Sequence, residues 1–378
     1  MRTERGWWIL LCVGLSLGAG PRSWGAESCY PYGLEVCEGD WPMARRDPAN
    51  RAWSLLDAQP PRPARAWSHR LEPHPWPQQA GQVVWASPAL GRVEGRPVLA
   101  AGSYDKQLVR LDAGTGELLW RYATGGGIHA PAAIWRDPEQ QASRVFASSS
   151  DRSVYALDAV TGARLWSTGL ETYRPSVGGA RLSAPCLGLV RGEPAVFVGH
   201  WVWDKSLAHS LQRGGLSAIH ARSGAKLWRL DFLDHRVGDA IYLPWGASGR
   251  VFVASEDGNL RCVDADSGRM LWAHRETERI MGAPALWRAE ADGRCRIYFG
   301  PHFGKLRCLD AEDGRLLWEY KSGNWLTGAP AVIEAQGIMG LLIDQDTRVP
   351  SVFVPFFGRP ASTPTAPAML ARKSGAAL

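Results

Sequence analysis

The sequence lacks several patterns that would each indicate a definite class of protein. Beyond residue 26, no stretch approaches the roughly 18 consecutive apolar residues of a membrane-spanning helix. The net charge is +6, yet no run of five or more basic residues occurs, so the positive charge is scattered along the chain. We therefore expect a mature chain with no transmembrane segment, and we do not expect nucleic acid to be a partner.

Cysteine occurs seven times, but never in the spacing of a zinc site or of a covalently attached haem. No two cysteines are adjacent, and no C-x-x-C motif occurs. Cys29 and Cys37 flank a short loop that contains Pro and Gly, and we expect them to form a disulfide. The spacing of Cys186, Cys262, Cys295 and Cys308 does not predict whether or how they pair.

The first 26 residues have the layout of a secretory signal peptide. Arg2 and Arg5 precede an apolar run over residues 7–17, and small residues follow up to Ala26. The apolar run is too short to span a bilayer comfortably, which disfavours the alternative of an N-terminal membrane anchor. We expect residues 1–26 to be removed and the mature protein to be periplasmic or secreted.

Tryptophan, glycine and proline are abundant instead. The chain of 378 residues contains 19 Trp, 42 Gly and 26 Pro, and this excess of aromatic and turn-forming residues favours short strands over helices. With 45% hydrophobic and 21% charged residues, the composition is that of a folded globular protein.

One ten-residue phrase recurs five times and predicts the architecture. Its copies are LDAGTGELLW, LDAVTGARLW, IHARSGAKLW, VDADSGRMLW and LDAEDGRLLW, which end at Trp120, Trp166, Trp228, Trp272 and Trp318. The spacings between these tryptophans are 46, 62, 44 and 46 residues. A period in the forties without a helical apolar pattern indicates a β-propeller.

Each copy of the phrase is interpreted as a tight turn between two strands. The aspartate hydrogen-bonds the backbone of the turn, the glycine supplies a positive φ, and the tryptophan lies on the strand that follows. In the third copy His220 replaces the aspartate, and we expect this change to weaken that turn. The turn residues are Asp112, Asp158, Asp264 and Asp310, with Gly116, Gly162, Gly224, Gly268 and Gly314.

The pattern predicts an all-β fold, a β-propeller of four-stranded antiparallel blades with strands A to D in chain order. Ala-Pro or equivalent strand openings favour six blades, with seven or eight as alternatives. Trp67 stands before the first opening, where a D-strand tryptophan would stand, so we expect an N-terminal strand to close the ring. The expected domains are a signal peptide (1–26), an N-terminal extension (27–64), the propeller (65–357) and a disordered tail (358–378).

The phrase followed by an Ala-Pro strand resembles the repeat of the pyrroloquinoline quinone (PQQ) propeller superfamily, over residues 65 to about 335. That superfamily includes quinoprotein alcohol dehydrogenases and an outer-membrane assembly lipoprotein. The resemblance implies that the repeated tryptophans dock between blades, and it names a fold rather than an activity. It also implies, for the enzymes, eight blades, two adjacent cysteines against the quinone, an aspartate base, and Glu and Asn ligands for calcium.

The remaining cysteines suit a structural role in this repeat. Cys262 and Cys308 take the place that Ala156 and Ala218 fill in other copies, so we interpret them as small buried core residues. Cys295 and Cys308 are expected on adjacent strands of one blade, where a bridge is an open alternative.

Two insertions are expected on the face opposite the Asp/Gly turns. One follows Trp166, and the other lies in the third blade's B-to-C turn, at residues 200–215. Because their blades are consecutive, we expect the insertions to meet and form a binding rim for a protein or small-molecule ligand, although packing loops are an equal alternative. Its expected residues are Tyr173, Arg174, Arg181, His200, Trp201, Trp203, Asp204 and His209.

Other residues expected on this face are Tyr104, His129, His235, Arg279, His302 and Trp325. A metal site built from His200, Asp204 and His209 is disfavoured, because loop spacing has no fixed geometry, and we expect no metal site.

These observations favour a non-catalytic binding or assembly scaffold in the cell envelope, with no cofactor and no catalytic residue assigned. The first alternative is a PQQ-dependent dehydrogenase that uses the quinone with calcium. It is disfavoured because the chain is short, has no adjacent cysteines and has no haem-binding segment. The second alternative is a partner-docking subunit of an envelope complex.

Overall fold

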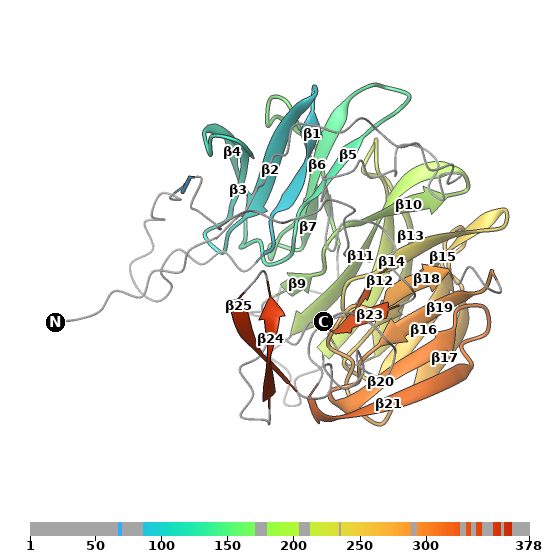
Figure 1. Cartoon of the computed structure of the whole chain (residues 1–378). Helices are drawn as coiled ribbons and strands as arrows, with labels where there is room; N and C mark the ends of the chain where they lie inside the picture. Colours follow the sequence, from blue (N-terminus) through green and yellow to red (C-terminus); the bar gives the residue numbers. More distant parts are fainter. Residues whose placement is uncertain are drawn as a thin grey trace.

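The computed structural model describes residues 67–69, 86–170, 180–203, 212–233, 236–288, 293–325, 330–333, 338–341, 351–356 and 359–364. Every regular element in these ranges is a β-strand, as expected for a propeller (Figure 1). None of them contains a helix long and apolar enough to cross a membrane. The expected signal peptide and the expected Cys29–Cys37 disulfide lie outside the described residues.

Five antiparallel sheets follow one another along the chain, and in each the strand order is the sequence order. The first sheet comprises β1 (Ala89–Val93), β2 (Arg96–Gly102), β3 (Gln107–Asp112) and β4 (Leu118–Ala123). The second comprises β5 (Ala133–Arg136), β6 (Ser143–Ser148), β7 (Ser153–Asp158) and β8 (Arg164–Gly169). The third comprises β10 (Cys186–Val190), β11 (Glu193–Trp203), β12 (Gln212–His220) and β13 (Lys226–Leu233), with β9 (Ala180–Leu182) added to β11.

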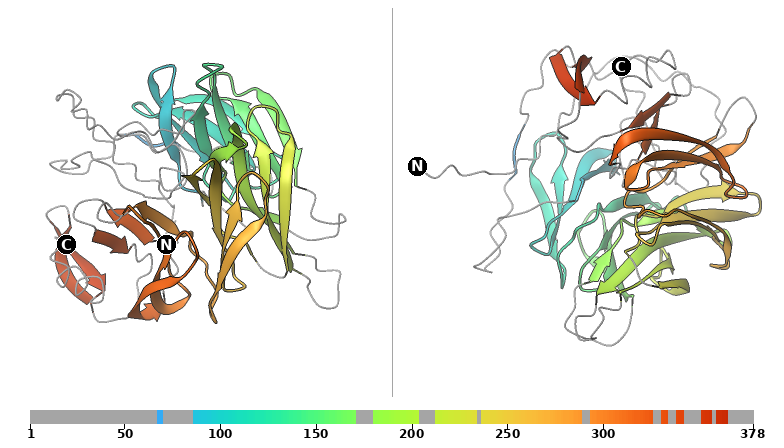
Figure 2. Two further views of the ribbon diagram at one scale, coloured as in Figure 1. Left: turned by 90° about the vertical axis from the view of Figure 1, so that its right-hand side faces the viewer. Right: turned by 90° about the horizontal axis from the view of Figure 1, so that it is seen from below.

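The fourth and fifth sheets repeat the plan. They comprise β14 (Ile241–Trp245), β15 (Ser248–Ala254), β16 (Asn259–Asp264) and β17 (Met270–Arg275), then β18 (Ala285–Arg288), β19 (Cys295–Phe299), β20 (Phe303–Asp310) and β21 (Leu316–Trp325). In the right-hand view of Figure 2 the five sheets fan out in chain order, from cyan through green and yellow to orange. The fold is therefore a β-propeller whose blades are these sheets.

Two further strand pairs follow the fifth blade. β22 (Pro330–Ile333) pairs with β23 (Ile338–Leu341), and β22 lies beside β18 as β5 lies beside β1. β22 and β23 therefore stand where the A and B strands of a sixth blade would begin. Among the described residues, β24 (Ser351–Phe356) pairs with β25 (Arg359–Pro364) alone. β25 lies within the expected tail (358–378), and the disorder of this tail stays a prediction.

The middle strands of each blade are buried on both faces. Val251 to Ala254 on β15 are all fully buried, as are Ala195 to Val198 on β11. Each blade packs its apolar faces against both neighbours, so its central strands read as continuous apolar runs rather than as alternating ones. The largest core cluster joins residues of the second to fifth blades.

The repeated turns are held by their aspartates. Asp112 Oδ1 accepts hydrogen bonds from the backbone N–H groups of Gly114 and Thr115, both at 2.9 Å. In the third copy the Nδ1 atom of His220 accepts from the backbone N–H of Ser223 at 3.2 Å and lies 2.9 Å from its hydroxyl. His220 thus replaces the aspartate as acceptor, and the expected weakness of this turn has no counterpart in its hydrogen bonds.

Four of the five repeat tryptophans pack on the glycine of the next blade's turn, namely Trp120, Trp166, Trp228 and Trp272. The Trp120 indole N–H donates to the Ala159 carbonyl at 2.9 Å, and only 8% of Trp120 is exposed. A Cβ atom on Gly162 would lie 2.8 Å from the Trp120 ring, so this position tolerates no side chain. Trp166 and Trp228 make the same hydrogen bond and are half-buried. Trp318 differs, because it is 40% exposed.

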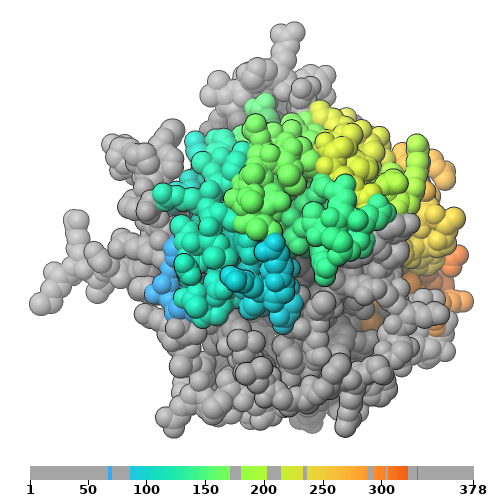
Figure 3. Space-filling view, turned by 90° about the horizontal axis from the view of Figure 1, so that it is seen from above, coloured from blue at the N-terminus to red at the C-terminus, as the bar shows by residue number. Residues whose placement is uncertain are grey.

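Trp67 occupies the same place on the first blade. Its indole N–H donates to the Ala113 carbonyl at 2.9 Å, and a Cβ atom on Gly116 would lie 2.5 Å from its ring. Figure 3 shows residues 67–69, in blue, against the first sheet. Trp67 therefore acts as the docking tryptophan of the blade that precedes β1 in the ring, which is the arrangement of an N-terminal closing strand.

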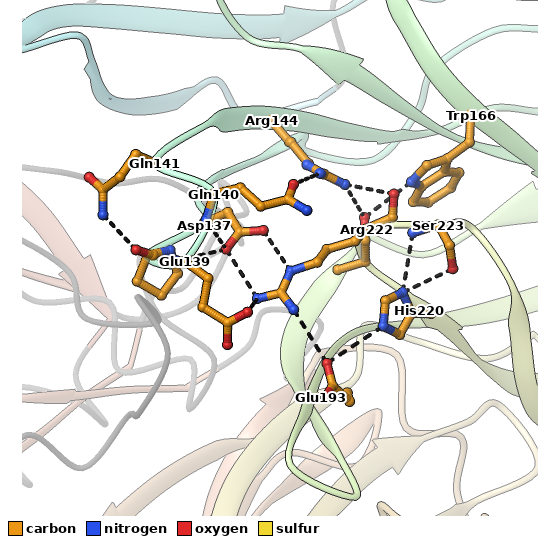
Figure 4. A network of polar contacts seen from close by, with 12 residues as sticks. Asp137, Glu139, Gln140, Gln141, Arg144, Trp166, Glu193, His220, Arg222 and Ser223 are labelled. Carbon is orange, nitrogen blue, oxygen red and sulfur yellow. Dashed lines mark hydrogen bonds and ion pairs between the residues drawn. The ribbon is translucent and has the colours of Figure 1, made fainter.

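A polar network fastens the second blade to the third (Figure 4). Asp137 is fully buried in the A-to-B turn of the second blade, and its two oxygens lie 2.7 and 3.1 Å from the Arg222 guanidinium. Arg222 also pairs with Glu139 at 2.8 Å and with Glu193 at 3.4 Å. Burial alone would raise the pKa of Asp137, but the Arg222 and backbone hydrogen bonds outweigh it and lower that pKa below its ordinary value.

Candidate functional site

Backbone hydrogen bonds define two faces of the propeller. The B-to-C turns and the D-to-A connections meet on one face, which we call the connection face. There the N–H of Ile128, between β4 and β5, donates to the Ser103 carbonyl, between β2 and β3. The Asp/Gly turns lie at the other end of the strands, where the Ala113 N–H donates to the Pro97 carbonyl. The described residues of the expected binding rim lie on β9 and β11, next to the connection face, and are Arg181, His200, Trp201 and Trp203.

One position recurs in the D-to-A connections of this face. The carbonyl groups of Gly127, Arg236 and Arg279 accept hydrogen bonds from the N–H groups of Ser150, Glu256 and His302 in the next blade, at 2.8 to 2.9 Å. Each is followed by a buried aliphatic residue, Ile128, Val237 or Ile280. Arg181, which precedes buried Leu182 and lies opposite Trp201 in the β9–β11 ladder, takes this position in the third blade.

The described ends of the two insertions lie together, as expected for neighbouring loops. β9 ends the first insertion and pairs with β11, where the second insertion begins, so that Arg181 faces Trp201 across the ladder. Both side chains are half-buried. Trp203 lies opposite Gln212 in the β11–β12 ladder. Tyr173, Arg174, Asp204 and His209 lie outside the described residues.

His200 is fully buried, so it cannot be the exposed rim residue that we expected. It takes the position that Ser103, Ser149 and Ser255 hold in other blades, and its imidazole points into the blade. Its Nδ1 lies 3.5 Å from the Ser217 hydroxyl, and its Nε2 lies 3.8 Å from an Asp231 oxygen. Burial, followed by the charge of Arg229, lowers the pKa of His200 to about 4.

This burial predicts an acid-sensitive stability. Because the folded protein holds His200 neutral while the unfolded chain protonates it near pH 6.5, the free energy of unfolding should fall as the pH drops from about 6.5 to about 4. The full loss amounts to about 3 kcal/mol. Urea unfolding at several pH values, for wild type and His200→Gln, measures the difference. Parallel pH profiles for the two proteins would show that His200 does not titrate in this way.

The connection face carries a positive charge on three consecutive blades. Arg181, Arg236 and Arg279 hold the recurring position in the third, fourth and fifth blades, and Arg236 and Arg279 are 46% and 66% exposed. Glu256 lies between Arg236 and Arg279. Its Oε1 atom is 3.8 Å from Arg236 Nη1, and its Oε2 atom is 4.0 Å from Arg279 Nη1. Burial, and then the charges of Arg181 and Arg236, lower the pKa of His129 in the connection between the first two blades.

Sequence reasoning found only part of this set. Arg181 and Arg279 were expected on this face, whereas Arg236 was missed and its neighbour His235 was named instead. If the D-to-A connections are aligned on the buried aliphatic residue instead of on the Ala-Pro pair, the three arginines occupy the same position of the alignment. Tyr104, His129 and His302 also lie on this face, and Tyr104 packs edge-on against His129 with ring centroids 5.0 Å apart.

The cysteines do not fit a quinone site of the dehydrogenase type. The chain has no adjacent cysteine pair. None of the four described cysteines, Cys186, Cys262, Cys295 and Cys308, is in a disulfide, and all are buried, so Cys295 and Cys308 form no bridge. Burial raises the pKa of the Cys262 and Cys308 thiols to about 12, which leaves them protonated and unreactive. Within the described ranges, no three His, Cys, Asp or Glu side chains converge as a metal site would require.

Comparison with known structures supports the propeller. Quinohemoprotein alcohol dehydrogenases of Comamonas testosteroni and Pseudomonas putida HK5 superpose with TM-scores of 0.57 and 0.58 at 18% and 17% identity. They cover 78% and 86% of this chain, which spans 52% and 51% of theirs. In sequence, the Comamonas testosteroni enzyme is 26% identical over 205 residues, which are 50% of this chain and 25% of the enzyme.

Two family models match different parts of the chain. Residues 322–378 match the bacterial lipid A biosynthesis acyltransferase family, which is a small part of the sequence. Residues 55–200 and 212–291, more than half of the chain, match the family described as outer membrane protein assembly factor BamB. The protein therefore belongs to the BamB family of PQQ-like β-propellers.

Proposed function

We propose that this protein is an exported, non-catalytic scaffold that binds or helps to assemble partner proteins in the cell envelope. The observation that carries the proposal is the match of more than half of the chain to an assembly-factor family. The connection face is the proposed docking surface, since it combines exposed arginines with aromatic side chains. Export would use residues 1–26 as a signal peptide, and the protein would act in the periplasm or outside the cell.

The competing function is PQQ-dependent oxidation, which the similar dehydrogenases favour. Titrating the protein with PQQ and Ca²⁺, followed by absorbance and by dye-linked alcohol oxidation, separates the two functions. The scaffold proposal expects no stoichiometric binding of the quinone and no oxidation. A photo-crosslinker placed at residue 201 should capture a partner, whereas one placed at Arg164, on the outer strand of the second blade, should not.

We also propose that residues 342–378 belong to a module separate from the propeller. β24 and β25 pair only with each other, and this segment lies within the match to the acyltransferase family. A two-stranded hairpin is marginal alone in water, so these strands would belong to a larger sheet of their own.

This division of the chain predicts how truncations behave. Ending the chain at Leu341 should change the melting temperature by less than about 2 °C, because the described strands that it removes, β24 and β25, pair with each other and not with a blade. Ending it at Trp325 removes β22 from beside β18 and should lower the melting temperature by more than about 5 °C. Differential scanning calorimetry measures both. A large loss in the Leu341 truncation would show that the last segment completes the ring.

A further inference from the structure

The contact between a docking tryptophan and the turn of the next blade is the same at five places in the described residues. Each indole packs on the turn glycine, and a Cβ atom on this glycine would lie 2.5 to 2.8 Å from the ring. These glycines have φ angles of 71 to 75°, which residues with a side chain rarely adopt. The pairs are Trp67 with Gly116, Trp120 with Gly162, Trp166 with Gly224, Trp228 with Gly268, and Trp272 with Gly314.

Most of these indoles also donate a hydrogen bond to the same turn. Four of the N–H groups reach the backbone carbonyl of the turn alanine at 2.7 to 3.1 Å, the acceptors being Ala113, Ala159, Ala221 and Ala265. The Trp272 N–H finds no acceptor among the described residues, and Arg250 donates to the equivalent Ala311 carbonyl instead. A docking tryptophan therefore recognises two features of a turn, a glycine without a side chain and a carbonyl group.

Trp318 ends the fifth copy of the phrase, and no sixth copy follows in the sequence to supply such a turn. Trp318 is 40% exposed, whereas Trp120 is 8% exposed and the other docking tryptophans are half-buried. Leu316, two residues earlier on β21, is also 40% exposed. The side of the fifth blade that would pack on a turn is therefore open to solvent at these two residues.

The Trp318 indole is nevertheless held as a docking tryptophan is held in other blades. Tyr298 of the same blade packs against it with ring centroids 5.9 Å apart. In the second to fourth blades the same contact measures 5.8 Å and is made by Phe146, Phe197 and Phe252. Trp318 also lies opposite Cys308 in its ladder, as Trp272 lies opposite Cys262. A turn that binds Trp318 would therefore meet a side chain that needs little reordering.

We propose that Trp318 is a docking site for an Asp/Gly turn presented by a partner protein. This proposal rests on the scaffold function and names the chemistry that the partner must present. The partner's turn places a glycine of positive φ against the indole and offers a backbone carbonyl to the indole N–H. A second copy of this chain suits the site less well, because its five turn glycines are already covered by its own tryptophans.

The test uses the full chain and a cyclic peptide with the sequence LDAGTGEL of residues 111–118 as probe, in a titration followed by ligand-observed NMR. The control peptide carries alanine in place of the glycine that corresponds to Gly116. The control should bind more than about tenfold more weakly, because its Cβ atom would meet the indole and its turn would need a positive φ.

Variants of the full chain identify the residue that binds the peptide. Trp318→Phe removes the N–H donor and should weaken binding about two- to tenfold. Trp318→Ala removes the ring as well and should weaken binding by more than about tenfold. The matched control is Leu119→Ser, which replaces an exposed apolar residue beside the docking tryptophan of the first blade and should leave binding unchanged.

Several results would overturn the proposal. They are no binding of the glycine peptide, equal binding of the two peptides, or binding that Trp318→Ala leaves unchanged. If Trp318→Ala does not fold by circular dichroism, Trp318→Phe and the two peptides decide. Sedimentation velocity tests the other occupant, since self-association of the wild type that Trp318→Phe weakens would assign the site to a second copy. Partner capture at residue 201 that persists when the glycine peptide fails to bind would leave the scaffold function standing while the turn site is rejected.

Discussion

Replacing Trp120 with alanine is expected to lower the free energy of unfolding by about 3–5 kcal/mol. The indole is 8% exposed, donates to the Ala159 carbonyl and packs against Gly162 of the next blade. The substitution removes this packing and leaves a cavity between two blades that are already fixed by their own sheets. Urea unfolding of the full chain at neutral pH measures the loss.

Trp318→Ala provides the matched control. Trp318 holds the same place in its repeat, but it is 40% exposed, so its truncation removes far less packing. We expect Trp318→Ala to lower the free energy of unfolding by less than about half as much as Trp120→Ala does. Equal losses for both variants would show that the position in the phrase, rather than packing onto the next blade, sets the stability.

The contrast between these two tryptophans explains why the repeat predicted the architecture so well. A docking tryptophan needs a glycine turn on the next blade, and five copies of the phrase therefore specify four successive blade contacts. Trp67 lies before the first copy and Trp318 in the last, so the same logic predicted the closing role of Trp67. No Asp/Gly phrase follows residue 318 in the sequence, so Trp318 has no repeat glycine on which to dock. Its exposure agrees with this.

The candidate site was predicted less well, because loops carry no fixed period. His200 looked like a rim residue, since it begins a long insertion rich in aromatic and charged residues. Its place is set by the β11–β12 ladder, which turns its imidazole towards Ser217 and Asp231. Arg236 was missed for the opposite reason, because its connection lacks the Ala-Pro pair used to align the others.

The polar junction of the second and third blades could not be read from the repeat at all. Asp137 lies in an A-to-B turn of irregular length, and Arg222 replaces residues such as Gly114 and Val160 of the other phrases. Only the packing of the blades brings these two side chains together, 85 residues apart in sequence. Arg144 adds to the junction by donating to the Ala221 and Arg222 carbonyls, at 3.1 and 2.8 Å.

Removing the arginine of this junction should lower the free energy of unfolding almost as much as removing a docking tryptophan. In Arg222→Ala the fully buried Asp137 carboxylate keeps only the N–H groups of Glu139 and Gln140, at 3.0 and 3.2 Å. An unpaired buried charge typically costs about 3–5 kcal/mol, and we expect about 3 kcal/mol here because the backbone donors remain. Glu139→Ala is the control. It removes a half-exposed partner of the same arginine and should cost less than about 1 kcal/mol.

A double-mutant cycle separates the ion pair from simple loss of packing. If Arg222 stabilises the fold by compensating Asp137, the variant that carries both Asp137→Ala and Arg222→Ala should be more stable than Arg222→Ala alone, because no charge is left buried. The pH dependence gives an independent measurement. The hydrogen bonds hold the pKa of Asp137 below its ordinary value, so the contribution of the pair is present above about pH 4 and is lost as the pH falls further. If the double variant is less stable than wild type by the sum of the two single losses, the two side chains act independently.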